Sequence, residues 1–350
     1  MRYEIQAARV LLRKLGDGPS PVSPWTRQAE VHVEDWAAEF GLIRSAAAWS
    51  RFRATAPGEL AGRVYATAAS QARLEAVTAW IGWLFLIDDQ LDEGATGKDP
   101  ALVMDRLRPF ADMAASFARW QKPAGMAAGT AGWSEGRSPR MRLRAALAQV
   151  WGSVAPAMPA GWRAVIARHY FDYLCGCEWE AENRARGQVP AEAEFAGKRR
   201  DAGAIWPSLD LLEYAAGAPL PDGPRDDPLL AAARTACADV VCWTDDLLTV
   251  GKERAHGDVH NLVIVLEYAT GCDERKAEDM VAQRIEARFA DFRELRRRVL
   301  ASDAGTGSAL RTHVAGLHDW MLGHLEWGLR TIRYSAGAAE SAGYLEDLLG

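Results

Sequence analysis

Apolar residues recur at helical spacing along almost the whole chain, and alternating patterns typical of β-strands are scarce. Glycine and proline gather at 16–24, 122–139, 217–228 and 302–308, where we expect loops. This pattern predicts an all-α bundle of about ten or more helices. The expected helices cover residues 29–40, 58–66, 69–93, 100–121, 140–153, 161–182, 191–200, 206–216, 227–250, 258–270, 274–300 and 307–335.

The expected loops do not divide the chain into separate halves, and no internal repeat is evident. A chain of 350 residues suits one large domain or two small ones. We therefore expect a single helical domain over residues 21–336. Residues 1–20 are interpreted as an N-terminal extension that can be flexible, and residues 337–350 as a C-terminal tail.

Composition narrows the class of protein further. Hydrophobic residues make up 49% of the chain, which is enough for a sizeable core, and a net charge of -6 argues against nucleic acid as a partner. No apolar run reaches the roughly 18 residues of a membrane span, and the start lacks the apolar core of a signal peptide. The five cysteines are scattered and form no zinc-binding pattern. These features predict a cytoplasmic protein with free thiols.

The segment AWIGWLFLIDDQLDE is an apolar helix that ends in four acids. Asp88 and Asp92 share one helix face, and Asp89 and Glu93 form a second such pair. One interpretation is a helix end that reaches solvent. However, acids at a helix C-terminus repel one another and the helix dipole unless a cation binds. Carboxylate oxygens are the ligands that Mg²⁺ prefers, so the segment favours a magnesium site.

A second acidic pattern lies in the segment VVCWTDDLLTVGKE. Asp245, Thr249 and Glu253 are spaced four and four, and they extend along roughly 12 Å of one helix side. Three such oxygen ligands can chelate one Mg²⁺, and Lys252 can hold a phosphate oxygen as a point charge. The alternative is an ordinary amphipathic helix whose polar stripe meets water.

Together, DDQLDE and the DDLLTVGKE that follows about 150 residues later resemble the bacterial class I terpene cyclases. The resemblance implies the class I terpenoid synthase fold, an α-helical bundle around a central apolar cavity. It also implies three Mg²⁺ ions. Asp88 and Asp92 would be ligands from the first motif, and Asp245, Thr249 and Glu253 from the second. Asp245 and Thr249 stand where asparagine and serine are commoner in the family.

Two further positions of the family match the segment GKRRDAGAIW. Arg199, which lies 46 positions before Asp245, is similar to the arginine that senses the diphosphate. Gly203 matches the position whose backbone carbonyl acts on the substrate. The position between them, often aspartate in the family, is Ala202 here, and Asp201 is a candidate substitute.

The closing segment WMLGHLEWGLRTIRY is also similar to that of the family. Arg333 and Tyr334 match an Arg-Tyr pair that grips the diphosphate when the site closes. Trp327 matches an aromatic residue that lines the pocket, as does Phe85, one turn before the first acids. Of the fourteen tryptophans, three more are weaker candidates for the pocket and are interpreted mainly as core residues: Trp206, Trp243 and Trp320.

The resemblance, from about residue 20 to residue 335, implies Mg²⁺-dependent ionisation and cyclisation of a linear prenyl diphosphate. Farnesyl diphosphate is the expected substrate, because most of the family uses it, and the product would be a terpene hydrocarbon or alcohol. The expected catalytic residues are Asp88, Arg199, Gly203, Arg333 and Tyr334. The diphosphate would bind Arg199, Lys252, Arg333 and Tyr334.

Three alternatives stay open at the level of the sequence. One is a chain-elongating prenyltransferase, which would carry a second aspartate-rich motif with an aspartate at position 248 or 249 instead of Leu248 or Thr249. Another is a cyclase that acts on geranyl or geranylgeranyl diphosphate. The third is a non-catalytic helical binding protein. A monomer or a homodimer is expected in each case.

Overall fold

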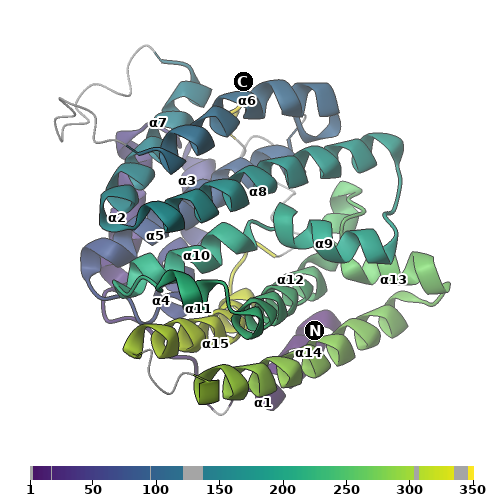
Figure 1. Ribbon diagram of the computed structural model, residues 1–350. Helices are drawn as coiled ribbons and strands as arrows, with labels where there is room; N and C mark the ends of the chain where they lie inside the picture. The colour runs from purple at the N-terminus through teal and green to yellow at the C-terminus, as the bar shows by residue number, and fades with distance from the viewer. Residues whose placement is uncertain (1–2, 17, 95, 121–136, 303–306, 335–345) are drawn as a thin grey trace.

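The computed structural model of the protein describes residues 3–16, 18–94, 96–120, 137–302, 307–334 and 346–350 (Figure 1). Within these residues the chain is helical and contains no strand, which confirms the predicted all-α class. No described helix is both long enough and apolar enough to cross a membrane. The helices are α1 (Tyr3–Leu15), α2 (Thr26–Glu39), α3 (Ala46–Thr55), α4 (Pro57–Val64), α5 (Gln71–Asp92), η1 (Thr96–Lys98), α6 (Pro100–Ala118), α7 (Pro139–Val154), η2 (Ala155–Ala157), α8 (Ala160–Arg186), α9 (Glu192–Ala202), α10 (Ile205–Ala216), α11 (Asp222–Arg225), α12 (Pro228–His256), α13 (Leu262–Thr270), α14 (Glu274–Ser302) and α15 (Ser308–Gly328).

Capping residues define where the two motif-bearing helices begin and end. The Ser70 hydroxyl accepts a hydrogen bond from a backbone N–H in the first turn of α5, and the Asp227 carboxylate does the same for α12. α12 ends at Gly257, whose φ of 74° lies in the left-handed region that glycine adopts easily. Asn261 caps α13, so this helix begins four residues later than predicted.

Two of the longer helices, α1 and α3, were not predicted from the apolar periodicity, and neither were the short α11, η1 and η2. α3 begins at the cap Ser45, whose hydroxyl accepts from the backbone N–H of Ala48, but its own apolar pattern is weak. α1 lies within the expected N-terminal extension and packs against α14, with Ala8 and Leu11 fully buried. Both helices are therefore stabilised mainly by their contacts with the rest of the molecule.

The predicted last helix ends seven residues early, at Gly328. The backbone N–H groups of Arg330 and Thr331 both donate to the carbonyl of Trp327, which turns the chain away from the helix axis. Arg333 and Tyr334 consequently lie on irregular chain and not on α15. This turn lets both side chains face the interior of the bundle, where they are buried.

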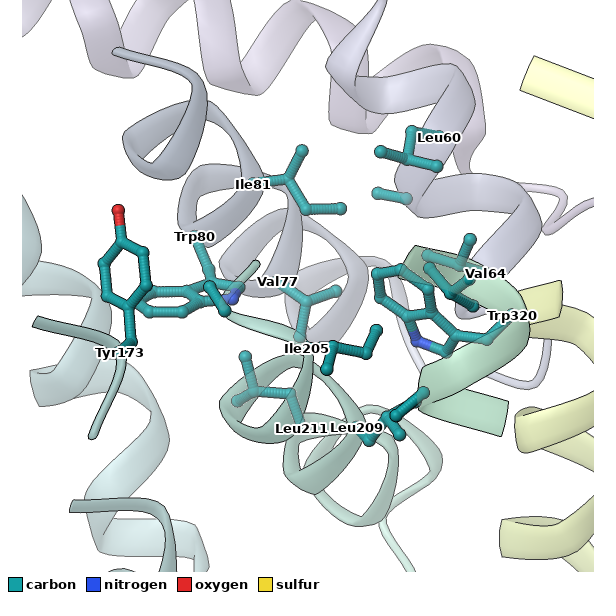
Figure 2. Close-up of a cluster of buried hydrophobic side chains, with 14 of the residues drawn as sticks. Leu60, Val64, Val77, Trp80, Ile81, Tyr173, Ile205, Leu209, Leu211 and Trp320 are labelled. Carbon is teal, nitrogen blue, oxygen red and sulfur yellow. The ribbon is translucent and has the colours of Figure 1, made fainter. Parts of the chain in front are cut away.

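The helices form a bundle in which α5, α8, α10, α12 and α15 surround the interior. α8 packs against α6 on one side and against α9 and α10 on the other, and α12 packs against α14 and α15 (Figure 1). α4 closes the bundle between α5 and α15. Figure 2 shows the apolar interior, in which side chains of α4, α5, α8, α10 and α15 converge: Leu60, Val64, Val77, Trp80, Ile81, Tyr173, Ile205, Leu209, Leu211 and Trp320.

Candidate active site

A cavity lies inside the bundle and changes character along its length. Apolar side chains such as Leu60, Ile81 and Ile205 line one part, and the acids Asp88 and Asp92 line another. Ile81 precedes Asp88 by seven positions on α5, which is about 10 Å along the helix. The cavity therefore has an apolar floor below a ring of acids.

The acids of the two motifs meet at this ring, although they lie about 150 positions apart. Asp88 and Asp92 from α5 line the same small pocket as Asp245, Thr249 and Glu253 from α12. Each helix presents these residues at a spacing of four, so their side chains point to one face. The structure thus brings together all five residues that were predicted as metal ligands.

Basic side chains hold the acids of the first motif. Arg333 donates to Asp88 at 2.6 Å and to Asp89 at 2.5 Å. Asp92 pairs with Arg184 of α8 at 3.2 Å. Asp89 does not line the pocket shared by the two motifs.

The second motif is held by a different set of partners. The Tyr334 hydroxyl donates to Asp245 at 2.5 Å, and Arg199 donates to the same carboxylate at 2.8 Å. The Thr249 hydroxyl donates to Glu253 at 2.7 Å. The other carboxylate oxygen of Glu253 accepts from the side-chain amide of Asn261, also at 2.7 Å.

Burial and mutual repulsion change the acidity of this cluster. Burial raises the pKa of Asp92 to about 7, and the neighbouring charge of Asp88 adds to the effect. Burial also raises the pKa of Asp88 and of Glu253. The pKa of Asp245 is lowered instead, because contacts with His324 and Arg199 outweigh its burial. In three of the four carboxylates the charged form is therefore disfavoured, and a bound cation would stabilise that form.

The chemistry of the donor set fits Mg²⁺. All five predicted ligands offer oxygen atoms, four carboxylates and one hydroxyl, and hard oxygen ligands are those that Mg²⁺ binds. Within the described part of the chain, no three His, Cys, Asp or Glu side chains converge closely enough to enclose an ion by themselves. Three of these acids are instead paired with arginines: Asp88 with Arg333, Asp92 with Arg184 and Asp245 with Arg199.

The predicted sensor segment lies at a break between α9 and α10. Arg199, which is buried, pairs with Asp245 and, through its Nε, with Asp246 at 2.8 Å. A Cβ added to Gly203 would lie 2.7 Å from the Arg199 guanidinium, so only glycine leaves room for this arginine. Ala204 then adopts a φ of 51°, and this left-handed residue turns the chain into α10.

The interpretation of Asp201 as a substitute in the sensor is not supported by any contact with Arg199. The carboxylates that pair with Arg199 are those of Asp246 and Asp245. Ala202 lines the cavity, as does Gly203. From the sequence, no role was assigned to Asp246, the second aspartate of the DD pair.

Lys252 lines the acid pocket, but its ammonium group pairs with Glu93 at 2.8 Å. The same carboxylate accepts from Arg51 of α3 at 2.6 Å. Glu93 thus anchors two cations at the rim of the site, and a diphosphate would compete with it for Lys252.

Aromatic side chains form part of the wall. Phe85 and Trp327 stack with their ring centroids 5.6 Å apart, and the Arg333 guanidinium lies 4.5 Å from the centre of the Phe85 ring. Trp320 also lines the cavity, although it was interpreted mainly as a core residue. Trp206 and Trp243 do not line the cavity and are partly buried against the core.

Sequence reasoning also missed a group of charged residues from α8 and the turn after α12. Arg184 donates to Asp258 at 2.6 Å as well as to Asp92, which connects the first motif with the residues that follow the second. Burial raises the pKa of Glu180, one turn before Arg184, to about 8. The feature of the sequence that could have indicated this group is the i, i+4 spacing of Glu180 and Arg184, but the same spacing is typical of ion pairs on a helix surface.

Comparisons with known proteins agree with this geometry. Residues 79–291 match the family described as "Terpene synthase family 2, C-terminal metal binding". The chain is 34% identical to (-)-delta-cadinene synthase of Streptomyces clavuligerus over 319 residues, which are 89% of this chain and 88% of that protein. It is 30% identical to (+)-T-muurolol synthase ((2E,6E)-farnesyl diphosphate cyclizing) of Roseiflexus castenholzii, with 90% of each chain covered.

The fold agrees as well. A crystallised variant of cucumene synthase superposes with a TM-score of 0.75 at 27% identity, over 91% of this chain and 99% of the other. The matched family region contains both acidic motifs and is the metal-binding part of the family, which implies a divalent metal. The chain therefore belongs to the terpene synthase family and is a class I terpene cyclase of the bacterial type.

Proposed function

We propose that the protein cyclises farnesyl diphosphate to a cyclic sesquiterpene and inorganic diphosphate, with three Mg²⁺ ions bound. The observation that supports this most directly is the meeting of both acidic motifs with Arg199 and Arg333 at the mouth of an apolar cavity. The farnesyl diphosphate specificity in the name of the related T-muurolol synthase supports the C15 substrate.

Ionisation of the substrate would take place at the ring of acids. Bound Mg²⁺ would neutralise the charge that develops on the leaving diphosphate, with Asp88, Asp92, Asp245, Thr249 and Glu253 as its protein ligands. Arg333 and Tyr334 would turn from Asp88 and Asp245 to the diphosphate oxygens. Arg199, which is held by the buried Asp246, would present its remaining donors to the same group.

The apolar part of the cavity would then hold the carbocation. Its walls exclude bulk water, which would quench the cation early. The stacked rings of Phe85 and Trp327 would stabilise positive charge by about 0.5–2 kcal/mol each when desolvated. The backbone carbonyl of Gly203, at the break between α9 and α10, is a further acceptor for positive charge.

Incubation with purified C10, C15 and C20 diphosphates and Mg²⁺ tests the proposal. We expect the C15 diphosphate to release diphosphate and to give a volatile cyclic product without any C5 partner. A chain-elongating enzyme would instead need a C5 partner and would give a longer diphosphate. The absence of metal-dependent diphosphate release from the C15 substrate would refute the proposed function.

The cytoplasm is the compartment we propose, because all five cysteines are free thiols. This one chain supplies every side chain named for the site. A monomer, or a homodimer with a complete site in each protomer, would therefore be active.

A further inference from the structure

Two buried polar side chains line the cavity, and each has a polar atom without a nitrogen or oxygen hydrogen-bond partner among the described residues. They are Tyr173 of α8, through its hydroxyl, and His324 of α15, through its Nδ1. The side chains are strongly buried, since the two residues are 1% and 5% exposed. A buried polar atom without a partner costs about 1–3 kcal/mol, so such atoms in a cavity indicate a polar ligand.

His324 lies where the acid ring meets the apolar floor. Its Nε2 is 3.0 Å from the Tyr334 hydroxyl and 3.6 Å from the Asp245 carboxylate. Its ring also packs against Trp327 at 5.9 Å. These contacts orient the imidazole through Nε2, and Nδ1 is the ring nitrogen that has no hydrogen-bond partner among the described residues.

Tyr173 lines the same cavity from α8. In Figure 2 its hydroxyl points toward the Ile81 end of the drawn cluster, which is the end nearer the aspartates of α5. The charge of Asp88 contributes to the raised pKa of Tyr173, which agrees with this position. The Tyr173 hydroxyl also contacts the thiol of Cys177, one turn along α8, and a thiol forms only a weak hydrogen bond, so the hydroxyl can still bind a stronger partner.

We propose that the Tyr173 hydroxyl and His324 Nδ1 retain water at the boundary of the cavity, and that this water ends the reaction, so that the product is a terpene alcohol. The inference rests on the proposed cyclase function. The Tyr173 hydroxyl can donate to or accept from a water molecule, and His324 Nδ1 accepts when Nε2 carries the proton and donates in the other tautomer, so a water can bind in both cases. A water held in this way differs from bulk water, because its hydrogen bonds restrict where it can attack.

The chemical step balances with groups that the reaction already supplies. The water oxygen adds to the cationic carbon and forms a C–O bond. The resulting oxonium then loses one proton to the inorganic diphosphate released by ionisation, and the alcohol is the product. Neither an oxidant nor a reductant is required, and neither Tyr173 nor His324 changes its covalent structure.

The first test is the reaction of the wild-type enzyme with farnesyl diphosphate and Mg²⁺ in water enriched in ¹⁸O. We expect a main product that is a C15 alcohol carrying ¹⁸O, detected as a mass increase by gas chromatography and mass spectrometry. A hydrocarbon as the main product, or an alcohol without the label, overturns the inference even though diphosphate is released. No diphosphate release at all refutes the proposed cyclase function.

The second test compares variants by the ratio of alcohol to hydrocarbon. We expect Tyr173→Phe and His324→Leu to lower this ratio about tenfold or more, because each removes one hydrogen bond to the water. His324→Gln keeps a donor and an acceptor at that point and should retain most of the alcohol. An unchanged ratio in both Tyr173→Phe and His324→Leu overturns the inference.

Tyr170 provides the matched control. It lies on α8, is buried like Tyr173 and also carries a hydroxyl without a partner among the described residues, but it does not line the cavity. Tyr170→Phe should leave the product ratio unchanged. A shift as large as that in Tyr173→Phe would show that loss of any buried hydroxyl on α8 alters the products, and this would overturn the role of Tyr173.

Discussion

The guanidinium group of Arg333 donates to the carboxylate of Asp88 at 2.6 Å, across 245 positions of the chain. A residue expected to grip the diphosphate thus neutralises a residue expected to hold the metal. In this contact Arg333 supplies to Asp88 the positive charge that a divalent ion would supply when metal and substrate are bound. Substrate and metal would therefore have to separate this pair, and the following predictions depend on that charge balance.

Loss of either acidic motif should abolish turnover while the fold persists. Asp88→Ala and Glu253→Ala each remove a carboxylate from the pocket shared by the two motifs, so we expect diphosphate release to fall by about three or more powers of ten. Steady-state kinetics with farnesyl diphosphate measure the loss. Asp105→Ala, at a surface acid that is 62% exposed, is the control and should be close to wild type. Wild-type rates in the motif variants would contradict the metal roles.

The position of Arg199 should depend on the absence of a side chain at Gly203. A Cβ in Gly203→Ala would come within 2.7 Å of the guanidinium and displace it, so we expect kcat to fall about 10–100-fold. Gly197→Ala, also on α9, is the matched control, because a Cβ there meets no atom within 4 Å. That variant should keep its activity and gain slight helix stability. Equal kinetics for the two variants would exclude a steric role for Gly203.

Metal and diphosphate should stabilise the protein together more than either does alone. Mg²⁺ by itself must compete with Arg333 and Arg199 for the acids, whereas diphosphate gives both arginines a new partner. When Mg²⁺ and diphosphate bind together at a hundredfold excess over their dissociation constant, they would add about 2.7 kcal/mol to the free energy of unfolding. Thermal melts with Mg²⁺, with inorganic diphosphate and with both measure this. Additive shifts would argue against the coupling.

The stability of the metal-free protein should depend on pH through Glu180. Burial, with help from Asp92 and Asp258, raises its pKa to about 8 against the opposing effect of Arg184. Its folded pKa exceeds the unfolded value of about 4.3, so its stabilising contribution is complete below pH 4.3 and is lost as the pH rises through 8.

Glu180→Gln removes this titration. Urea denaturation between pH 5 and pH 8 should show a free energy of unfolding that falls with pH in the wild type and falls less in the variant. The difference between the two proteins should therefore grow toward pH 8. Parallel curves across this range would show that Glu180 does not titrate as inferred.

The helical class could be predicted from the sequence because a 3.6-residue apolar period is a local property. The caps at Ser70 and Asp227 are local in the same sense, and they agree with the predicted starts of α5 and α12 within two residues. The end of α15 was predicted wrongly, since the apolar pattern continues past Gly328 while the backbone turns away. Helix α1 was missed although its apolar residues recur at helical spacing, because residues 1–20 were interpreted as an extension, and α3 was missed because its own apolar pattern is weak.

The candidate site, like the fold, could be predicted only in part from the sequence. Residue spacing on one helix determined that Asp88 and Asp92 share a face, and that Asp245, Thr249 and Glu253 share another. Only the tertiary structure decided that these faces meet, that Asp246 and not Asp201 holds Arg199, and that Trp320 lines the cavity while Trp206 does not. Helical periodicity determines the direction of a side chain about its own axis, whereas the packing of separate helices determines what that side chain faces.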